Sequence, residues 1–237
     1  MKSKVSNYWR KQCTFAVQNS NQMSRYTLRE EKANTLTHAI GIPFGIIVFF
    51  LFLKNNLSSD NYWLLISTLV YATFMTFSYI TSTLYHNQRA ESKKLLLRKF
   101  DHAAIYLHIA GSYTPFTLVV LRNEGYWGWS LFGIIWLAAL AGVLLSFAKL
   151  KNASKLETAC YVAMGWVVIV AFKPLIDVLS ASDSMPVFWW LVAGGVFYTV
   201  GAVIYSLKKV EFMHAVWHFF VLGGSVCHAI AISLISA

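Results

Sequence analysis

Residues 126–147 read YWGWSLFGIIWLAALAGVLLSF, a run of sequence without a single charged side chain. A helix needs roughly 20 mainly apolar residues to cross the hydrocarbon layer of a bilayer. Six further stretches have a comparable length and character, at about residues 36–54, 61–85, 101–121, 158–179, 186–206 and 213–235. The sequence therefore predicts an all-α integral membrane protein, folded as a bundle of seven transmembrane helices.

The composition agrees with this fold class. Hydrophobic residues make up 57% of the chain and charged residues only 13%, which excludes an ordinary soluble domain. The predicted spans use most of the 237 residues, so we expect one bundle over residues 36–237, preceded by a basic segment over residues 1–35. That segment lacks the short apolar core of a secretory signal peptide, and span one is expected to stay in the mature protein.

Positive charges are distributed unevenly between the two sets of connecting loops. Only Lys54, Arg122 and Lys173, of the 20 lysines and arginines, lie on the side opposite the N-terminus. The remaining ones are Lys2, Lys4, Arg10, Lys11, Arg25, Arg29, Lys32, Arg89, Lys93, Lys94, Arg98, Lys99, Lys149, Lys151, Lys155, Lys208 and Lys209. The positive-inside rule then predicts a cytoplasmic N-terminus and, after seven spans, a C-terminus outside. Because topology and anionic headgroups explain the net charge of +10, we expect membrane lipids and no nucleic acid as partners.

The predicted topology carries five polar side chains to the cytoplasmic ends of their spans: Ser82, His86, Asp101, His214 and His218. Ser82 and His86 are four residues apart, as are His214 and His218, so each pair projects from one face of a helix. Span two ends on the cytoplasmic side, and spans three and seven begin there. Three imidazoles and a carboxylate at one depth of an apolar bundle predict a metal site near the cytoplasmic side.

The donor set indicates which metal and which chemistry to expect. Imidazoles without thiolates favour Zn²⁺, with iron, nickel or copper as alternatives. Three histidines leave one position of a tetrahedral site open for water, the arrangement of a catalytic zinc site. Asp101 could accept a proton from that water, and Ser82 could donate a hydrogen bond to it or to a developing oxyanion.

Each of these residues also has an ordinary structural explanation. Histidines near helix ends often lie in the membrane interface, and Asp101 would favourably meet the positive end of a helix dipole. We expect His102, which points about 100° away from Asp101 on a helix, to be interfacial and no ligand. His108 and His228 are expected to be buried and to donate to backbone carbonyls. The three cysteines, which topology keeps apart, predict no disulfide framework.

Five stretches of sequence, in order, cover about residues 30–235. They are Glu31-Lys-Ala-Asn34-Thr-Leu-Thr37-His38, Ser82-Thr-Leu-Tyr-His86, Arg98-Lys-Phe-Asp101-His102, Ala110-Gly-Ser-Tyr-Thr-Pro-Phe116 and Phe212-Met-His214-Ala-Val-Trp-His218. This combination resembles the motifs of the hemolysin III family. That family is the bacterial branch of the progestin and adipoQ receptor superfamily, which includes the adiponectin receptors. The alkaline ceramidases are similar in carrying Ser-x-x-x-His, a later Asp and a final His-x-x-x-His.

The resemblance implies that His86, His214 and His218 hold zinc, and that Asp101 and Ser82 hold the zinc-bound water. It further implies a hydrolase of lipid amide or ester bonds in the bacterial cytoplasmic membrane, with a fatty-acyl or ceramide-like substrate and a role in membrane-lipid homeostasis. Two alternatives stay open, a receptor or membrane-state sensor with structural zinc and a cytolysin of the kind that the family name implies. The oligomeric state is left open.

The first of these stretches lies at the cytoplasmic mouth of span one. Its residues Glu31, Asn34 and His38 are expected close enough to the metal ligands to support them from a second layer. For Glu31 and Asn34, bracing of the adjacent loop is the favoured explanation. Thr27 and Glu30 fit a capping box, which predicts the start of a short helix at the membrane surface.

Overall fold

The computed structural model describes residues 26–148, 153–207 and 210–235. The described part of the predicted basic segment begins at Tyr26, so Cys13 and most of that segment lie outside it. The elements in chain order are α2 (Leu28–Ala39), α3 (Gly41–Asn56), α4 (Tyr62–Asn87), α5 (Glu91–Pro115), the π-helix η1 (Phe116–Val120), α6 (Trp127–Phe147), α7 (Ala153–Trp166), the 3₁₀-helix η2 (Val167–Ala171), α8 (Phe172–Ala181), α9 (Met185–Ser206) and α10 (Met213–Ile235). No strand occurs among these described residues.

Seven of the resulting helical stretches are long and apolar enough to cross a membrane, which confirms the predicted fold class. They are Leu28–Asn56, Tyr62–Asn87, Glu91–Val120, Trp127–Phe147, Leu156–Ala181, Met185–Ser206 and Met213–Ile235. Most boundaries fall within two residues of those predicted, but the first and third helices begin eight and ten residues earlier. Their extra turns are rich in Glu, Lys and Arg, which favour helix but are not apolar.

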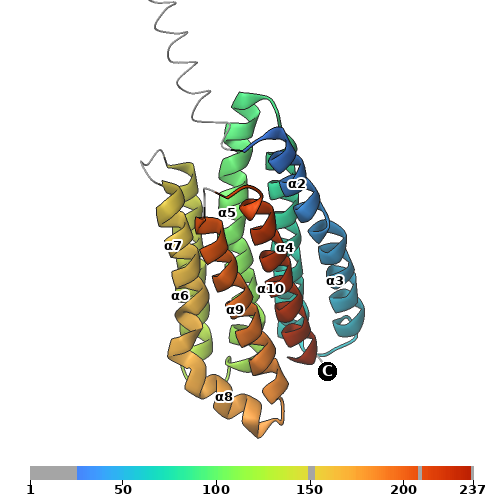
Figure 1. Ribbon diagram of the computed structural model, residues 1–237. Helices are drawn as coiled ribbons and strands as arrows, with labels where there is room; N and C mark the ends of the chain where they lie inside the picture. Colours follow the sequence, from blue (N-terminus) through green and yellow to red (C-terminus); the bar gives the residue numbers. More distant parts are fainter. Residues whose placement is uncertain (1–25, 149–152, 208–209, 236–237) are drawn as a thin grey trace, which may run out of the picture.

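The seven helices run side by side, with α5 the most enclosed of them (Figure 1). Of the residues in the most apolar window of its span, 72% are buried, against 22–50% for the other spans. It contacts α4, α6 and α7, while α9 packs chiefly against α10. The connection between α4 and α5 and the start of α10 lie at the same end of the bundle as α2, and the C-terminus lies at the other end (Figure 1). Which end faces the cytoplasm stays a prediction.

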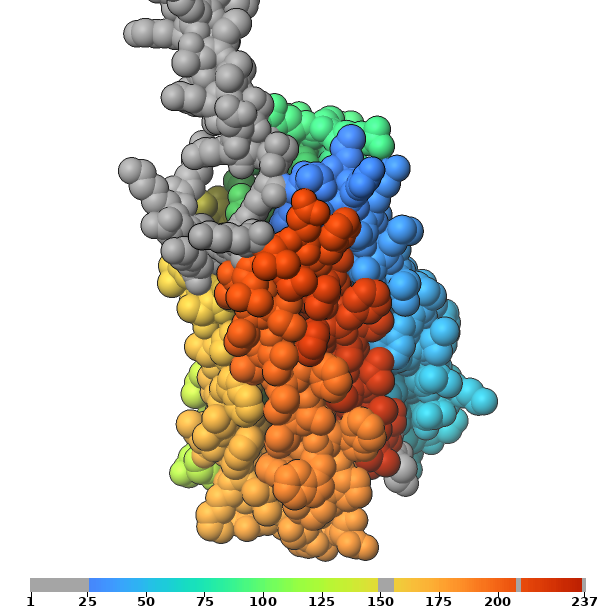
Figure 2. Space-filling view, in the orientation of Figure 1, coloured from blue at the N-terminus to red at the C-terminus, as the bar shows by residue number. Residues whose placement is uncertain are grey.

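The helix α2 begins with the predicted capping box. The Thr27 side chain accepts the Glu30 backbone N–H at 3.2 Å, and the Glu30 carboxylate accepts the Thr27 N–H at 2.8 Å. The other carboxylate oxygen of Glu30 accepts the Phe212 N–H, at 3.3 Å, just before α10. The helix also packs on α4 and α10, and it lies beside α10 on the molecular surface (Figure 2). Residues close to the N-terminus are therefore held against the last span.

The third and fifth spans both contain an irregular stretch of helix. After Pro115 the α5 helix continues as the π-helix η1, and after Trp166 the α7 helix tightens into the 3₁₀-helix η2. The Tyr113 hydroxyl bridges the second irregularity: it accepts the Val168 N–H at 3.0 Å and lies 2.9 Å from the carbonyl oxygens of Met164 and Gly165. Backbone groups released from regular helix are thus satisfied inside the bundle, as an apolar surrounding requires.

Candidate metal centre

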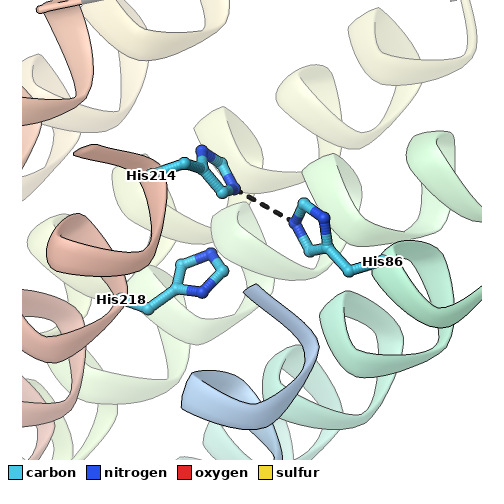
Figure 3. Close-up of side chains that lie close together, drawn as sticks. All are labelled: His86, His214 and His218. Carbon is cyan, nitrogen blue, oxygen red and sulfur yellow. Dashed lines mark hydrogen bonds between the residues drawn. The ribbon is translucent and has the colours of Figure 1, made fainter. Parts of the chain in front are cut away.

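Three imidazoles meet at the end of the bundle where α2 lies. His86 comes from the last turn of α4, and His214 and His218 come from the first turns of α10 (Figure 3). One ring nitrogen from each lies within 4.8 Å of the others, and the Nε2 atoms of His86 and His214 are 3.0 Å apart. Histidines more than a hundred residues apart in sequence are therefore placed within reach of one ion.

The second ring nitrogen of each of these histidines contacts an oxygen from a single short segment. His214 Nδ1 lies 3.1 Å from the Tyr26 hydroxyl, His86 Nδ1 2.7 Å from Glu31 Oε2, and His218 Nδ1 2.9 Å from Thr37 Oγ1. Such an oxygen fixes the tautomer and the orientation of a metal-binding imidazole. All three partners lie between residues 26 and 37, so α2 and its approach orient the whole cluster.

The residues present fit a zinc ion. The Nε2 atom of His218 is buried and has no hydrogen-bond partner among the described residues, a costly state for a polar atom unless a ligand occupies it. Two imidazole nitrogens on one tetrahedral zinc are separated by about 3.3 Å, close to the spacing of His86 and His214. His86 and His218 are both almost fully buried, and among the residues that the structure describes three protein ligands converge. The donor set therefore leaves room for one further ligand.

Asp101 and Ser82 lie beside this cluster. Ser82 is buried on α4, one turn before His86, and its side chain interacts with the carboxylate of Asp101 on α5. Asp101 is half-buried and lines the internal cavity of the bundle together with His214. A proton acceptor and a hydroxyl donor thus stand next to the imidazoles.

The three residues expected in the second layer have different environments. Glu31 contacts His86 with one carboxylate oxygen and the Lys94 ammonium with the other, at 2.6 Å, so it connects a candidate ligand to α5. The His38 ring stacks on His218, with a centroid distance of 3.4 Å, but it lies outside the set of converging nitrogens. Asn34 is fully buried, and its amide has no hydrogen-bond partner in the described part of the chain.

A cavity of about 170 Å³ extends from the cluster into the bundle. Asp101, His102 and His214 line it near the cluster, and residues of η1, α8 and the first half of α9 line it farther along. Its wall is mostly apolar, with Phe116, Phe172 and Leu191 among the residues that enclose it. An elongated apolar group could therefore lie with one end beside the three imidazoles.

The remaining histidines partly match their predicted environments. His228 Nε2 lies 3.3 Å from the Leu191 carbonyl oxygen, as predicted. The prediction for His108 is wrong, since its Nδ1 contacts the Ser78 hydroxyl at 3.3 Å instead of a carbonyl oxygen. His102 is no member of the cluster, and it is paired with Glu157 at 2.6 Å instead of facing an interface alone.

Sequence reasoning did not single out Tyr26, Thr37, Lys94 and Glu157. Tyr26 and Thr37 are hydroxyl residues with no distinctive spacing, and their partners depend on how α2 packs against α10. In the sequence, Lys94 indicates only topology. Glu157 could have been found, because an acidic residue at the start of an apolar span is a candidate functional residue by default.

Comparison with known proteins gives consistent matches over nearly the whole chain. A family model described as "Haemolysin-III related" matches residues 26–229. "Hemolysin-3" of Bacillus cereus is 41% identical over 210 residues, which cover 86% of this chain and 91% of that protein. The "Hemolysin-3 homolog" of Bacillus subtilis (strain 168) is 40% identical, covering 84% and 91% of the two chains. The human "Monocyte to macrophage differentiation factor" is 30% identical, covering 87% and 84%.

Proposed function

Since the chain belongs to the haemolysin-III related family of multi-pass membrane proteins, and since three of its imidazoles converge beside a mostly apolar cavity, we propose that it is a zinc-dependent hydrolase of lipid amide or ester bonds. The single observation that carries the proposal is the position of this cluster at one end of the cavity. A lipid whose acyl chain fills the cavity brings its carbonyl group next to the imidazoles.

In the proposal, His86, His214 and His218 hold the zinc ion. When bound, zinc polarises a carbonyl oxygen and makes water a better nucleophile at neutral pH. The contacts with Tyr26, Glu31 and Thr37 keep the three Nε2 atoms directed at one point, so the ligands need little reorganisation on binding.

The protein groups around this point have separate tasks. Asp101 takes up a proton of the attacking water, because it is the carboxylate on the cavity wall beside His214. Ser82 orients the Asp101 carboxylate through their side-chain contact. The apolar wall holds the acyl chain and excludes bulk water, which strengthens the polar interactions at the reacting carbonyl. The predicted topology places this reaction in the inner leaflet of the bacterial cytoplasmic membrane.

Purified protein in lipid nanodiscs tests the proposal. Wild type should contain one zinc per chain and release fatty acid from N-acyl or ester lipids, and His214→Ala should lose both properties. Asp101→Ala should retain zinc but hydrolyse at least about 100-fold more slowly, since general acid–base groups contribute about 10²–10⁴-fold. Zinc-loaded wild type that releases no fatty acid from any lipid of either class would overturn the proposal, as would an Asp101→Ala variant as fast as wild type.

A second candidate function is a sensor of membrane state in which the metal is structural. It is favoured by the contacts of all three candidate ligands with residues 26–37, because metal occupancy would then tighten the packing of α2 against α4 and α10. A sensor of this kind should show a large drop in melting temperature when zinc is removed and no turnover of any lipid. The hydrolase should show turnover under the same conditions.

A further inference from the structure

A histidine on the cavity wall is paired with an acidic residue behind it, outside the cluster of three imidazoles. His102 follows Asp101 on α5, and its Nδ1 atom lies 2.6 Å from Oε2 of Glu157 on α7. The Glu157 side chain is only 4% exposed, so its carboxylate is enclosed by the bundle. The Tyr161 hydroxyl donates to the His102 carbonyl at 3.0 Å and further joins the two helices.

The other ring nitrogen of His102 remains open. His102 lines the same cavity as Asp101 and His214, and within the described part of the chain its Nε2 atom has no hydrogen-bond partner. The His102 side chain is 16% exposed, and its Nε2 atom keeps accessible surface. The Nδ1 atom of the imidazole ring is thus held by a carboxylate, while the Nε2 atom is available to a bound molecule.

This arrangement has a specific chemical meaning. A carboxylate on Nδ1–H fixes the tautomer, leaves Nε2 to exchange protons, and stabilises the imidazolium form. For packing alone the pair is a poor choice, because apolar residues of similar volume join two helices without the cost of burying a carboxylate. A buried acid that orients a histidine toward a cavity is the pattern of a residue that transfers protons.

We propose that His102 is a catalytic residue that protonates the leaving group of the hydrolysed bond, and that Glu157 is its positioning residue. The inference rests on the proposed hydrolase function and adds its second proton transfer. A water oxygen forms the new bond to the carbonyl carbon, and the proton it loses passes to Asp101. As the C–N or C–O bond breaks, its electron pair stays on the leaving atom, which takes the proton from His102 Nε2. The proton on Asp101 returns through water to His102, so acid and amine or alcohol are the only products.

The test compares substrates that differ in their need for that proton. An N-acyl lipid needs it, because an amine is a poor leaving group, whereas a p-nitrophenyl fatty ester releases a stable phenolate without it. His102→Asn is the matched variant, since its amide nitrogen can still donate to Glu157 but cannot transfer a proton. His102→Phe removes both properties, and Glu157→Gln removes the charge that stabilises the imidazolium.

With zinc content at the wild-type level, His102→Asn should lose about 100-fold or more of kcat on the amide. It should keep p-nitrophenyl ester hydrolysis within a few-fold of wild type, and Glu157→Gln should show the same selectivity with a smaller loss. Equal losses on both substrates, or wild-type rates for His102→Asn on both, would overturn the inference while leaving the hydrolase intact. If the wild-type protein hydrolyses neither substrate, the proposed function itself fails, and this inference fails with it.

Discussion

Glu31 is the residue on which the orientation of His86 depends. Its carboxylate is shared between the imidazole, at 2.7 Å, and the Lys94 ammonium, at 2.6 Å. Such outer carboxylates raise the basicity of a metal-binding imidazole and hold its ring in place. Two partners on one side chain also mean that a change at Glu31 is transmitted to both α4 and α5.

Replacement of Glu31 by glutamine should weaken zinc binding by about 10- to 100-fold, because the neutral amide no longer fixes the tautomer of His86 by charge. Competition with a chelator of known zinc affinity measures this in purified protein. Glu91→Gln is the matched control, because Glu91 is exposed in the first turn of α5, and it should bind zinc as wild type does. Equal affinities in the two variants would contradict the role given to Glu31.

The sequence indicates His86, His214 and His218 because two four-residue spacings and a shared depth mark them without any knowledge of packing. Tyr26 and Thr37 could not be predicted in this way. A hydroxyl group becomes a partner of His214 or His218 only through the placement of α2 against α10, a contact that spans more than 180 residues of sequence. The pairing of His102 with Glu157 depends in the same way on how α5 faces α7.

At the scale of helices, glycine sets how closely α6 approaches η1. A Cβ atom on Gly128 would lie 2.5 Å from the Thr117 carbonyl oxygen and 2.6 Å from that of Leu121, and both are backbone atoms that cannot easily move. A Cβ atom on Gly133, on the same helix, would meet no atom within 4 Å. The two glycines therefore form a matched pair of positions at which to compare substitution by alanine.

Gly128→Ala should lower the free energy of unfolding by about 1–3 kcal/mol, the usual cost of overpacking. Gly133→Ala should leave it unchanged or raise it slightly, since alanine favours helix more than glycine does. Denaturation by SDS in mixed micelles, followed by circular dichroism, measures both. The close packing of α6 on η1 would be refuted by two variants of equal stability.

Tyr113 holds the irregular fifth span by its hydroxyl group alone. Tyr113→Phe leaves the Val168 N–H and nearby carbonyl oxygens without their partner, and should destabilise the protein by about 1–3 kcal/mol. The exposed Tyr126 offers the control Tyr126→Phe, for which no loss is expected. Thermal unfolding in detergent compares the two, and a melting temperature that Tyr113→Phe leaves at the wild-type value would exclude this role.

Hydropathy predicts where all seven spans end to within two residues, because the apolar length of a helix follows from the bilayer. It misses the early starts of the first and third helices, whose first turns are polar. It also gives no sign of η1 or η2. The type of irregular helix depends on partners such as the Tyr113 hydroxyl.

For the whole molecule, the predicted orientation has a direct test. Lys93 and Glu124 are exposed at opposite ends of the third span. In a variant whose native cysteines are replaced by serine, a membrane-impermeant thiol reagent added to spheroplasts should label Glu124→Cys and spare Lys93→Cys. Labelling of both after lysis is the control. Labelling of Lys93→Cys alone in sealed spheroplasts would invert the topology and place the candidate metal centre at the outer face.

The fold class could be predicted from the sequence because the bilayer imposes one length and one composition on every span. The cavity could not, since it is formed by side chains of α5, α7, α8, α9 and α10 whose facing directions are set by packing. The predicted topology places the three histidines at one depth, but the distances between their rings depend on how the helices pack.

The contacts of Tyr26 and Thr37 with α10 also order events during biosynthesis. A ribosome delivers these two hydroxyls first and their imidazole partners almost last, separated by 188 and 181 residues. Until the final segment inserts, Tyr26 and Thr37 lack their imidazole partners, and a nascent chain stalled before His214 supplies only one of the three nitrogens. Only a polypeptide that has inserted its last span can therefore assemble the complete histidine cluster.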